Sequence, residues 1–287
     1  MKELAIISGK GGTGKTSLAA CFAFLAESLV LADCDVDAAD LHILTQPRII
    51  HQEPFVGGKK ALIAPDKCSQ CGICLENCRY GAIKEVFEVD PVACEGCALC
   101  HYLCPESAIT MEETLNGTWY ISETRMGPMV HANLIPGEEN SGKLVALVRN
   151  QAKVIAEERN IDMVIVDGAP GVGCPVISSI TGVDHVVIVT EPTMSGLHDM
   201  KRAAELVRGF GTPISLVINK WDIHPGMAME IEEYGKSSDI HLAGKIPYDR
   251  LVTDSMVRRR AVVEEDPGPA SKAILDVWKV INQHIYK

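Results

Sequence analysis

The chain has 287 residues and a formal net charge of −11, with 47% hydrophobic and 23% charged residues. This composition is typical of a soluble globular protein with one large or two ordinary domains, and its acidity argues against nonspecific binding to nucleic acid. Eleven cysteines could form disulfides in a secreted protein, but the first residues do not resemble a signal peptide and no apolar run is long enough to span a membrane. We therefore expect a cytoplasmic protein whose cysteines are reduced and bind metal.

Short apolar runs alternate with helical stretches over most of the chain. The first apolar run, at 4–7, precedes a glycine-rich segment and a helix expected at 16–28. Further apolar runs occur at 29–32, 163–166, 185–189, 214–218 and 241–246, and helices are expected at 143–158 and 196–207. Continuous apolar strands separated by helices predict a mostly parallel, doubly wound α/β sheet that is covered on both faces.

The segment after the first strand is a complete G-x-x-x-x-G-K-T phosphate loop. Its backbone N–H groups can surround phosphate oxygens, Lys15 can neutralise the terminal phosphates, and the Thr16 hydroxyl can bind Mg²⁺. The sequence therefore predicts that a nucleoside triphosphate and its Mg²⁺ are bound by Gly9, Lys10, Gly11, Gly12, Thr13, Gly14, Lys15, Thr16 and Ser17.

Two cysteine runs of the form C-x2-C-x2-C-x3-C interrupt the α/β pattern further along the chain. This is the bacterial ferredoxin spacing, in which thiolates bind 4Fe-4S clusters and the fourth cysteine of a run binds the other cluster. We therefore expect one cluster on Cys68, Cys71, Cys74 and Cys104, and a second on Cys94, Cys97, Cys100 and Cys78. Paired zinc sites are the alternative, which the doubled spacing disfavours.

The two cysteine runs also form an internal repeat, because similar sequences flank both. Each half is too small to bury a core, so bound clusters are expected to supply much of the folding free energy. The predicted organisation is a small α+β ferredoxin-like domain at 61–113, inserted into a nucleotide-binding domain formed by 1–60 and 114–287. Arg79 departs from the repeat, since Pro105 stands at the equivalent place in the second run.

Lys10, in the string Lys-Gly-Gly-Thr-Gly-Lys-Thr, gives the loop its resemblance to the deviant phosphate loop of the MinD, ParA and nitrogenase iron protein superfamily. The chain looks most similar to MinD-type ATPases that contain an inserted ferredoxin domain. In this family the earlier lysine reaches the nucleotide of the opposing subunit. The resemblance therefore implies a homodimer that forms with ATP, in which Lys10 and Lys15 both serve catalysis.

Acidic residues follow two of the apolar strands, as in the switch segments of this family. Asp35 matches the residue that orients the attacking water, and Asp33 and Asp37 are the alternative acids. Asp167 follows the strand at 163–166 and matches the second switch, where the carboxylate holds Mg²⁺ through water. The resemblance thus implies that Asp35 is catalytic and that Asp167 serves cofactor binding.

Asn219 and Lys220 follow another apolar strand, and Asn219 matches the base-contacting asparagine of the MinD family. The same segment, which ends at Asp222, also fits the N-x-x-D type signature by which GTPases read guanine, whereas the family resemblance favours ATP. Pro247 lies in a segment that resembles the last base-side loop of the family, and a plain turn from strand to helix is the alternative.

Three functions follow from these features. The first is an ATPase whose nucleotide state gates electron transfer through two 4Fe-4S clusters to a redox partner protein. The second is an ATPase that carries clusters or metal to a metalloprotein client, and the third is a ParA-like positioning protein with a redox-sensing module. Eight ligands of ferredoxin type indicate permanently held clusters, which favours the first.

Two further features lie outside these motifs. Apolar residues of the last helix recur at helical spacing, namely Ile274, Val277, Trp278, Ile281 and Ile285. MinD proteins use a terminal amphipathic helix on membranes, but the lack of a basic cluster favours a helix packed on the sheet. Cys174 follows Asp167 at the place where the nitrogenase iron protein has a cluster cysteine, and a buried structural thiol is the alternative.

Overall fold

The structure is a computed structural model that describes residues 1–138, 141–265 and 267–286, and it forms two compact units. The larger unit comprises Met1–Gln52, Trp119–Asn133 and Ser141–Lys287, and the smaller unit comprises Glu53–Thr118 and Leu134–Asn140. The smaller unit is wider than the insertion expected at 61–113. It takes in parts of two long strands that flank the cysteine runs, β3 (Arg48–Ile63) and β4 (Ile109–Thr124).

Parallel strands form the framework of the larger unit. In the described part of the chain the strand order is β3-β4-β5-β2-β6-β1-β7-β8-β9. Every neighbouring pair from β5 to β9 in this order is parallel, so the mostly parallel α/β sheet predicted from the sequence is confirmed. These strands are β1 (Lys2–Ser8), β2 (Val30–Asp33), β5 (Gly127–Leu134), β6 (Met163–Pro170), β7 (His185–Thr190), β8 (Ile214–Asn219) and β9 (His241–Ile246).

The order of the strands reverses next to β1, which lies between β6 and β7. The chain places β2 on one side of β1 and later adds β7, β8 and β9 on the other side. In open α/β sheets, ligands bind in the crevice at the carboxyl ends of the strands where the order reverses. The carboxyl ends of β1 and β6 are therefore where the topology predicts a ligand site.

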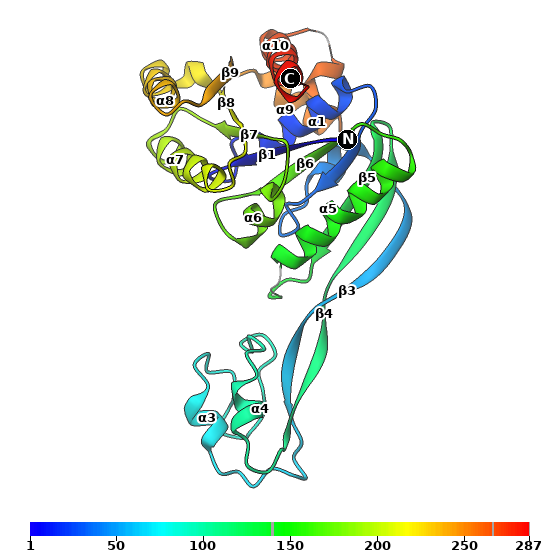
Figure 1. Ribbon diagram of the computed structural model, residues 1–287, viewed down its shortest axis with the longest axis vertical. Helices are drawn as coiled ribbons and strands as arrows, with labels where there is room; N and C mark the ends of the chain where they lie inside the picture. Colours follow the sequence, from blue (N-terminus) through cyan, green and yellow to red (C-terminus); the bar gives the residue numbers. More distant parts are fainter. Residues whose placement is uncertain (139–140, 266, 287) are drawn as a thin grey trace. The chain divides into compact units, whose positions relative to one another are not determined.

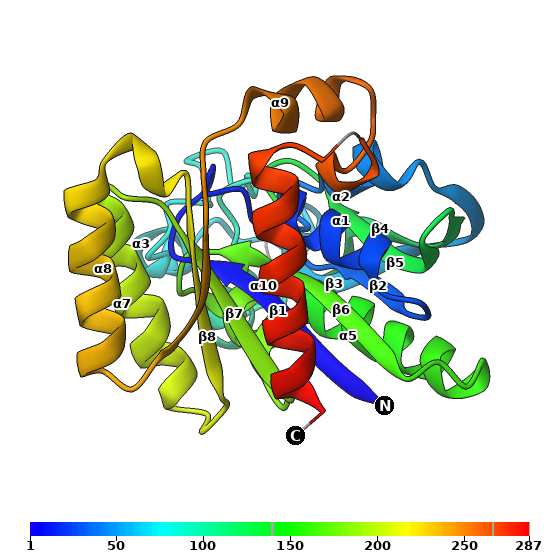
Figure 2. The ribbon, with the colours of Figure 1, turned by 90° about the horizontal axis from the view of Figure 1, so that it is seen from above.

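Helices cover both faces of this sheet. Figures 1 and 2 show α1 and α10 side by side on one face, and α5, α6 and α7 lie on the other face. The helices of this unit are α1 (Lys15–Leu25), α2 (Leu41–Thr45), α5 (Ser141–Glu158), α6 (Cys174–Ile180), α7 (Met194–Arg208), α8 (Pro225–Ser237), α9 (Arg250–Val257) and α10 (Pro269–Ile285). The described residues of this unit also form 3₁₀ helices at Trp221–Ile223 and Val262–Glu264.

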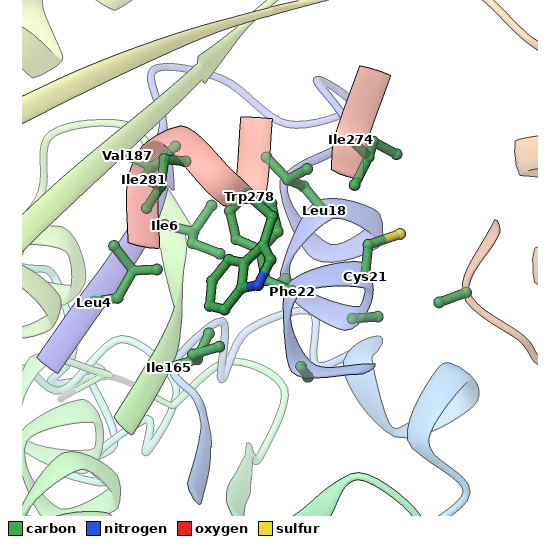
Figure 3. Packing of buried hydrophobic residues seen from close by; sticks show 14 of the residues in the cluster. Leu4, Ile6, Leu18, Cys21, Phe22, Ile165, Val187, Ile274, Trp278 and Ile281 are labelled. Carbon is green, nitrogen blue, oxygen red and sulfur yellow. The ribbon is translucent and has the colours of Figure 1, made fainter. Parts of the chain in front are cut away.

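The apolar stripe of α10 is buried in the main core (Figure 3). Trp278 packs its ring on Phe22 of α1, with ring centroids 5.0 Å apart, and Ile274 and Ile281 are buried beside it. The stripe is therefore part of the protein interior, which is the sheet-packed arrangement favoured by the sequence rather than a membrane-facing helix. Among the described residues, no helix combines the length and apolar character needed to span a bilayer.

The smaller unit has little regular structure apart from the strand segments of β3 and β4. Its two helices are one-turn elements, α3 (Ile73–Asn77) and α4 (Leu99–Leu103), and each begins within a cysteine run. Buried residues of its core include Ile63, Ile83 and Ile109, and six of the ferredoxin-type cysteines lie in or against this core. The cysteine side chains thus provide part of the interior of this unit.

Candidate nucleotide site and cysteine cavities

The phosphate loop connects β1 to α1 and is shaped by its glycines. Gly12 and Gly14 adopt positive φ angles of 80° and 91°, which residues with a Cβ rarely adopt. A Cβ on Gly9 would collide with the backbone of Asp199, and a Cβ on Gly14 would collide with the side-chain amide of Asn219. These glycines therefore allow the loop to lie directly against α7 and against the end of β8.

Lys15 of the loop is surrounded by carboxylates from the ends of two strands. Its Nζ atom lies 2.7 Å from Asp167 Oδ1 and 3.4 Å from Asp35 Oδ2, and its side chain is 6% exposed. The sheet register places Asp33 beside Asp167, and both are fully buried. Burial lowers the pKa of Lys15, but Asp167 and Asp35 outweigh it and the pKa is raised. One ammonium thus faces three carboxyl groups.

The excess of acid at this point fits a second cation. Burial and the nearby Asp167 raise the pKa of Asp33 well above its usual value, and burial also raises the pKa of Asp35. Among the described residues, the buried Oδ2 atoms of Asp33 and Asp167 have no hydrogen-bond partner. The hydroxyl of Thr16 lies close by and accepts a hydrogen bond from Lys15 at 3.3 Å. Carboxylate and hydroxyl oxygens are the ligands that hydrated Mg²⁺ prefers.

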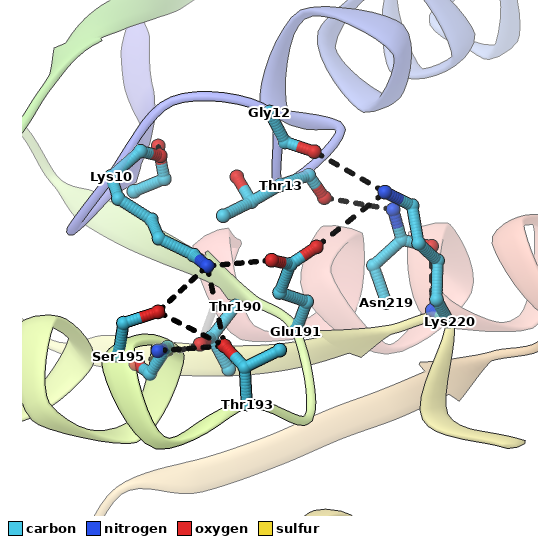
Figure 4. Close-up of polar contacts among 11 residues, drawn as sticks. Lys10, Gly12, Thr13, Thr190, Glu191, Thr193, Ser195, Asn219 and Lys220 are labelled. Carbon is cyan, nitrogen blue, oxygen red and sulfur yellow. Dashed lines mark hydrogen bonds and ion pairs between the residues drawn. The ribbon is translucent and has the colours of Figure 1, made fainter. Parts of the chain in front are cut away.

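Lys10 is bound within its own chain, on the segment that joins β7 to α7 (Figure 4). Its Nζ atom lies 2.6 Å from Glu191 Oε1, and it donates hydrogen bonds to Ser195 Oγ at 2.9 Å and to Thr193 Oγ1 at 3.2 Å. Thr193 also caps α7, because its Oγ1 accepts a hydrogen bond from Gly196 N at 2.9 Å. In the single chain Lys10 therefore contacts the start of α7.

Asn219 and Lys220 contact the opposite side of the phosphate loop. Asn219 Nδ2 donates to the Thr13 carbonyl at 2.8 Å, and Lys220 Nζ lies 3.3 Å from the Gly12 carbonyl. A pocket adjoins the loop here, and its lining includes Ser17, Leu18, Asn219, Ile246, Met256 and Arg260. The wall contains Ile246, the residue before Pro247. This position beside Gly14 and Ser17 suits the base of a bound nucleotide.

Asp222 is held by the chain beyond β9. Its Oδ1 atom accepts a hydrogen bond from Tyr248 N at 2.6 Å. A GTPase-type signature uses the equivalent carboxylate to accept hydrogen bonds from guanine. Asp222 thus anchors the Tyr248 backbone through Oδ1, and it is not among the residues that line the cavity.

The eight ferredoxin-type cysteines of the smaller unit line two separate cavities. The lining of one cavity includes Cys68, Cys71, Cys74 and Cys104. The lining of the other includes Cys78, Cys94, Cys97 and Cys100. In each cavity three cysteines come from one run and the fourth comes from the other run, which is the crossed grouping expected from the sequence.

The backbone around the two runs repeats the same unusual conformations. Positive φ angles occur just before the second cysteine of each run, at Gln70 and Gly96, and just after it, at Gly72 and Ala98. They recur three residues after the last cysteine of each run, at Gly81 and Ser107. Left-handed residues turn successive N–H groups toward one side of the chain, where they can face an anionic group. Gln70, Ala98 and Ser107 adopt these angles despite their Cβ atoms.

The arrangement of cysteines differs from that of a site for a single ion. Among the residues that the structure describes, no three His, Cys, Asp or Glu side chains converge closely enough to hold one metal ion. A 4Fe-4S cluster is bound by four cysteines that each contact a different iron, so their sulfur atoms need not meet at one point.

The three remaining cysteines lie in the larger unit. Cys174 is exposed at the start of α6, so the buried thiol considered as its alternative role is wrong. Cys21 and Cys34 are fully buried. Burial raises the pKa of Cys21 to about 12 and raises that of Cys34 well above its usual value, so both stay protonated.

Sequence reasoning assigned no role to Glu191, Thr193 or Ser195, although they contact Lys10. These residues directly follow β7, a buried apolar strand. The same signal, polar residues after an apolar strand, had identified Asp167 and Asn219. Applied to β7, this rule would have placed Glu191 at the site.

A glycine-rich loop at the head of a parallel sheet, with acids at the ends of the neighbouring strands, defines a P-loop nucleotide-binding protein. Residues 4–262 match the family model of the CobQ/CobB/MinD/ParA nucleotide binding domain. The chain therefore belongs to this family.

Individual proteins are similar to the whole chain or to a part of it. The chain is 36% identical over 228 residues to an uncharacterized protein of Methanocaldococcus jannaschii, covering 76% of this chain and 78% of the relative. A segment of 53 residues, 18% of this chain and 65% of the relative, is 40% identical to pyruvate synthase subunit PorD of Methanothermobacter marburgensis. The septum site-determining protein MinD of Pyrococcus horikoshii, solved with Mg-ADP, shares the fold with a TM-score of 0.60 and 13% identity over 98% of this chain and 96% of that chain.

Proposed function

We propose that the chain is an ATPase of the MinD/ParA type that binds Mg·ATP in its larger unit and forms a homodimer when ATP is bound. The observation that carries the proposal is the position of Lys15, which lies between the phosphate loop and the carboxylates of Asp35 and Asp167. The fold likeness to a MinD solved with Mg-ADP supports the choice of ligand.

Each side chain of the site then has a role in hydrolysis. The N–H groups of the loop and the Lys15 ammonium bind the phosphates, and Asp35 orients the attacking water. Thr16 and Asp167, with Asp33 beside them, provide oxygen ligands for Mg²⁺, which supplies charge neutralisation when it is bound. Lys10 stabilises the phosphates of the partner subunit as charge develops on them.

The base side of the site supports ATP rather than GTP. The cavity beside Asn219 is mostly apolar, and it includes a cation, Arg260. Guanine presents N–H donors that need an acceptor such as a carboxylate, and one oxygen of the Asp222 carboxylate already accepts from Tyr248 N. We therefore assign Asn219 to contact the base, with Lys220 and Pro247 on the loops beside it.

Two variants test the ATPase proposal, with nucleotide binding measured by calorimetry and turnover by phosphate release. Asp35→Asn should keep ATP binding and lower turnover by about a hundredfold or more, because the water loses its orienting carboxylate. Lys10→Ala should keep binding and lower turnover about a thousandfold, the scale of a cation supplied in trans. Lys279→Ala is the control, since Lys279 is exposed on α10 and pairs with Asp276. Wild-type turnover in both test variants would contradict the assignment.

We further propose that the smaller unit binds two 4Fe-4S clusters, and the observation that carries this is the pair of four-cysteine cavities. The positive φ angles shared by the two runs support it, because N–H groups aimed at one side suit an anionic cluster. The bound clusters supply one-electron chemistry. The short segment identical at 40% to a pyruvate synthase subunit is compatible with a redox role.

The smaller unit is strongly acidic, which indicates the kind of partner surface that it would bind. It contains twelve acidic and five basic side chains, so it holds most of the excess acid of the chain. A redox partner or metalloprotein client that docks on it is therefore expected to present a basic surface, because complementary charge speeds association. A cluster carrier and a redox sensor in a positioning ATPase are the competing roles, and both would use the same cavities.

Metal analysis and two cysteine variants test the cluster proposal. Anaerobically prepared protein should contain about eight iron and eight sulfide per chain. Cys104→Ala should disturb the cluster of the first run, and Cys78→Ala that of the second, as judged by electron paramagnetic resonance of the reduced protein. Two zinc ions and no iron would refute the proposal, and loss of the cluster of the same run would refute the crossed ligation. Comparing cluster reduction potentials with ADP and with an ATP analogue then separates an ATP-gated relay, whose potentials shift, from a carrier or sensor.

A further inference from the structure

Lys10 is fully satisfied by groups of its own subunit. Its three partners are the Glu191 carboxylate at 2.6 Å, the Ser195 hydroxyl at 2.9 Å and the Thr193 hydroxyl at 3.2 Å. A lysine ammonium has three N–H donors, so these contacts use its whole capacity. Figure 4 shows the Lys10 side chain directed to this group, and the ion pair is only partly exposed, at 26% for Lys10 and 19% for Glu191.

Glu191 connects two sides of the nucleotide site. Its Oε1 atom binds Lys10, and its Oε2 atom lies 3.5 Å from Lys220 Nζ, which also contacts the Gly12 carbonyl. Burial raises the pKa of Glu191, but the hydrogen bond and charge of Lys10, followed by those of Lys220, outweigh it and hold the pKa below its usual value. Glu191 is therefore ionised at neutral pH and binds lysines from both sides of the loop.

We infer that Glu191 is a positioning residue that retains Lys10 in its own subunit and so opposes dimer formation until ATP is bound. The inference rests on the proposed ATP-dependent dimer. For Lys10 to reach a phosphate of the partner subunit it must first leave Glu191, Ser195 and Thr193. A ligand shifts such an equilibrium only by its preference for one state, and a triphosphate offers Lys10 more negative charge than one carboxylate does. The Lys10–Glu191 ion pair within one subunit thereby sets how much negative charge the nucleotide must offer before the dimer assembles.

Glu191→Gln tests this directly, because glutamine keeps the size of the side chain and removes its charge. With a nonhydrolysable ATP analogue, sedimentation should show a lower dimer dissociation constant. The decrease should be about three- to fivefold for each subunit, which is the scale of a partly exposed ion pair. Turnover measured below the wild-type dimer dissociation constant should rise with the dimer fraction. Dimers that are no tighter than wild type would overturn the inference.

Glu232→Gln is the matched control. Glu232 of α8 also binds two lysines, Lys236 at 3.0 Å and Lys245 at 3.1 Å, and it is 21% exposed. Its substitution should leave dimerisation unchanged, whereas an equal gain would show that lost negative charge alone explains the effect and would overturn the inference. In a Lys10→Ala background, Glu191→Gln should give no further gain, because Glu191 acts through Lys10.

Ser195→Ala provides a second variant that does not depend on the folding of Glu191→Gln. It removes one hydrogen bond to Lys10 and should tighten the dimer in the same direction by a smaller factor. A wild-type chain that stays monomeric with the ATP analogue would overturn the proposed ATP-dependent dimer and the inference with it. A wild type that dimerises, beside Glu191→Gln and Ser195→Ala variants that do so equally well, would overturn only the role of Glu191.

Discussion

Replacing Lys15 by methionine measures how strongly the strand-end acids depend on this lysine. Methionine keeps much of the apolar stem and removes the ammonium that lies 2.7 Å from Asp167 and 3.4 Å from Asp35. Removing one partner of a buried ion pair costs about 3–5 kcal/mol, because an uncompensated charge remains. A unit of this size loses about 2–4 °C in Tm for each kcal/mol, so the Tm without nucleotide should fall by about 6–20 °C.

The loss should depend on pH in a defined direction. Burial raises the pKa of both Asp33 and Asp35 in the folded chain. A carboxyl group with a raised pKa binds a proton more readily in the folded state than in the unfolded state, so stability rises as pH falls toward that pKa. In Lys15→Met the acids have lost their counter-ion, and their protonation removes part of the repulsion. The Tm deficit should therefore shrink as the pH is lowered from 7 toward 5.5.

Thermal melting followed by circular dichroism at both pH values checks this reasoning. Lys153→Met is the control, because Lys153 Nζ lies 2.9 Å from Glu3 Oε2 while Glu3 keeps a second partner, Arg149, at 2.7 Å. Because Glu3 keeps Arg149 as a counter-ion and Lys153 is 32% exposed, this loss should cost less than about 1 kcal/mol, or at most about 4 °C. Equal losses in the two variants, or a Lys15→Met deficit that does not shrink at the lower pH, would refute the argument.

Three further outcomes are expected. Burial lowers the pKa of His131 and His185 to about 4. Each histidine should therefore lower the free energy of unfolding by up to about 3 kcal/mol as the pH falls from about 6.5 to 4. In urea titrations, a His131→Gln, His185→Gln double variant should lose less stability over this range. Ala98→Gly should stabilise the smaller unit by about 1 kcal/mol, because Ala98 adopts a φ of 62° where the other cysteine run has Gly72. An unchanged midpoint of urea unfolding would contradict this. Asp222→Asn should retain the preference for ATP over GTP in competition binding, because its carboxylate binds Tyr248 N; a gain or loss of GTP binding would place it at the base.

The sequence predicts the larger unit well because its strands are buried on both faces. Strands β1, β6, β7 and β8 appear in the sequence as continuous apolar runs, and the structure has strands at these positions. Strands β3 and β4 escaped prediction because most of their residues are exposed or only partly buried, so that no apolar run marks them. The extent of the smaller unit was missed for the same reason, since these strands form its ends.

Local motifs could be predicted from the sequence more readily than contacts between residues that are distant in the sequence. The phosphate loop and the cysteine runs are contiguous patterns, so their spacing alone suggests the groups that line one site. The partners of Lys10 are far away in the sequence, at Glu191 and Ser195, and only the order of the strands brings them next to the loop. The sequence shows that these residues are polar and follow a strand, but only the topology of the sheet shows that they contact Lys10.

Both lysines of the phosphate loop are bound to carboxylates of their own chain, so nucleotide binding exchanges one set of ion pairs for another. When Lys15 turns to a phosphate, Asp167 and Asp33 lose their counter-ion while fully buried. Buried carboxylates without a counter-ion are costly, and a divalent cation restores the balance. ATP and Mg²⁺ should therefore bind as a pair, and chelating Mg²⁺ with EDTA should weaken ATP binding in calorimetry by about tenfold or more, which corresponds to about 1.4 kcal/mol. In an Asp33→Asn, Asp167→Asn double variant the dependence on Mg²⁺ should largely disappear, and a variant that retains it would show that these acids do not hold the cation.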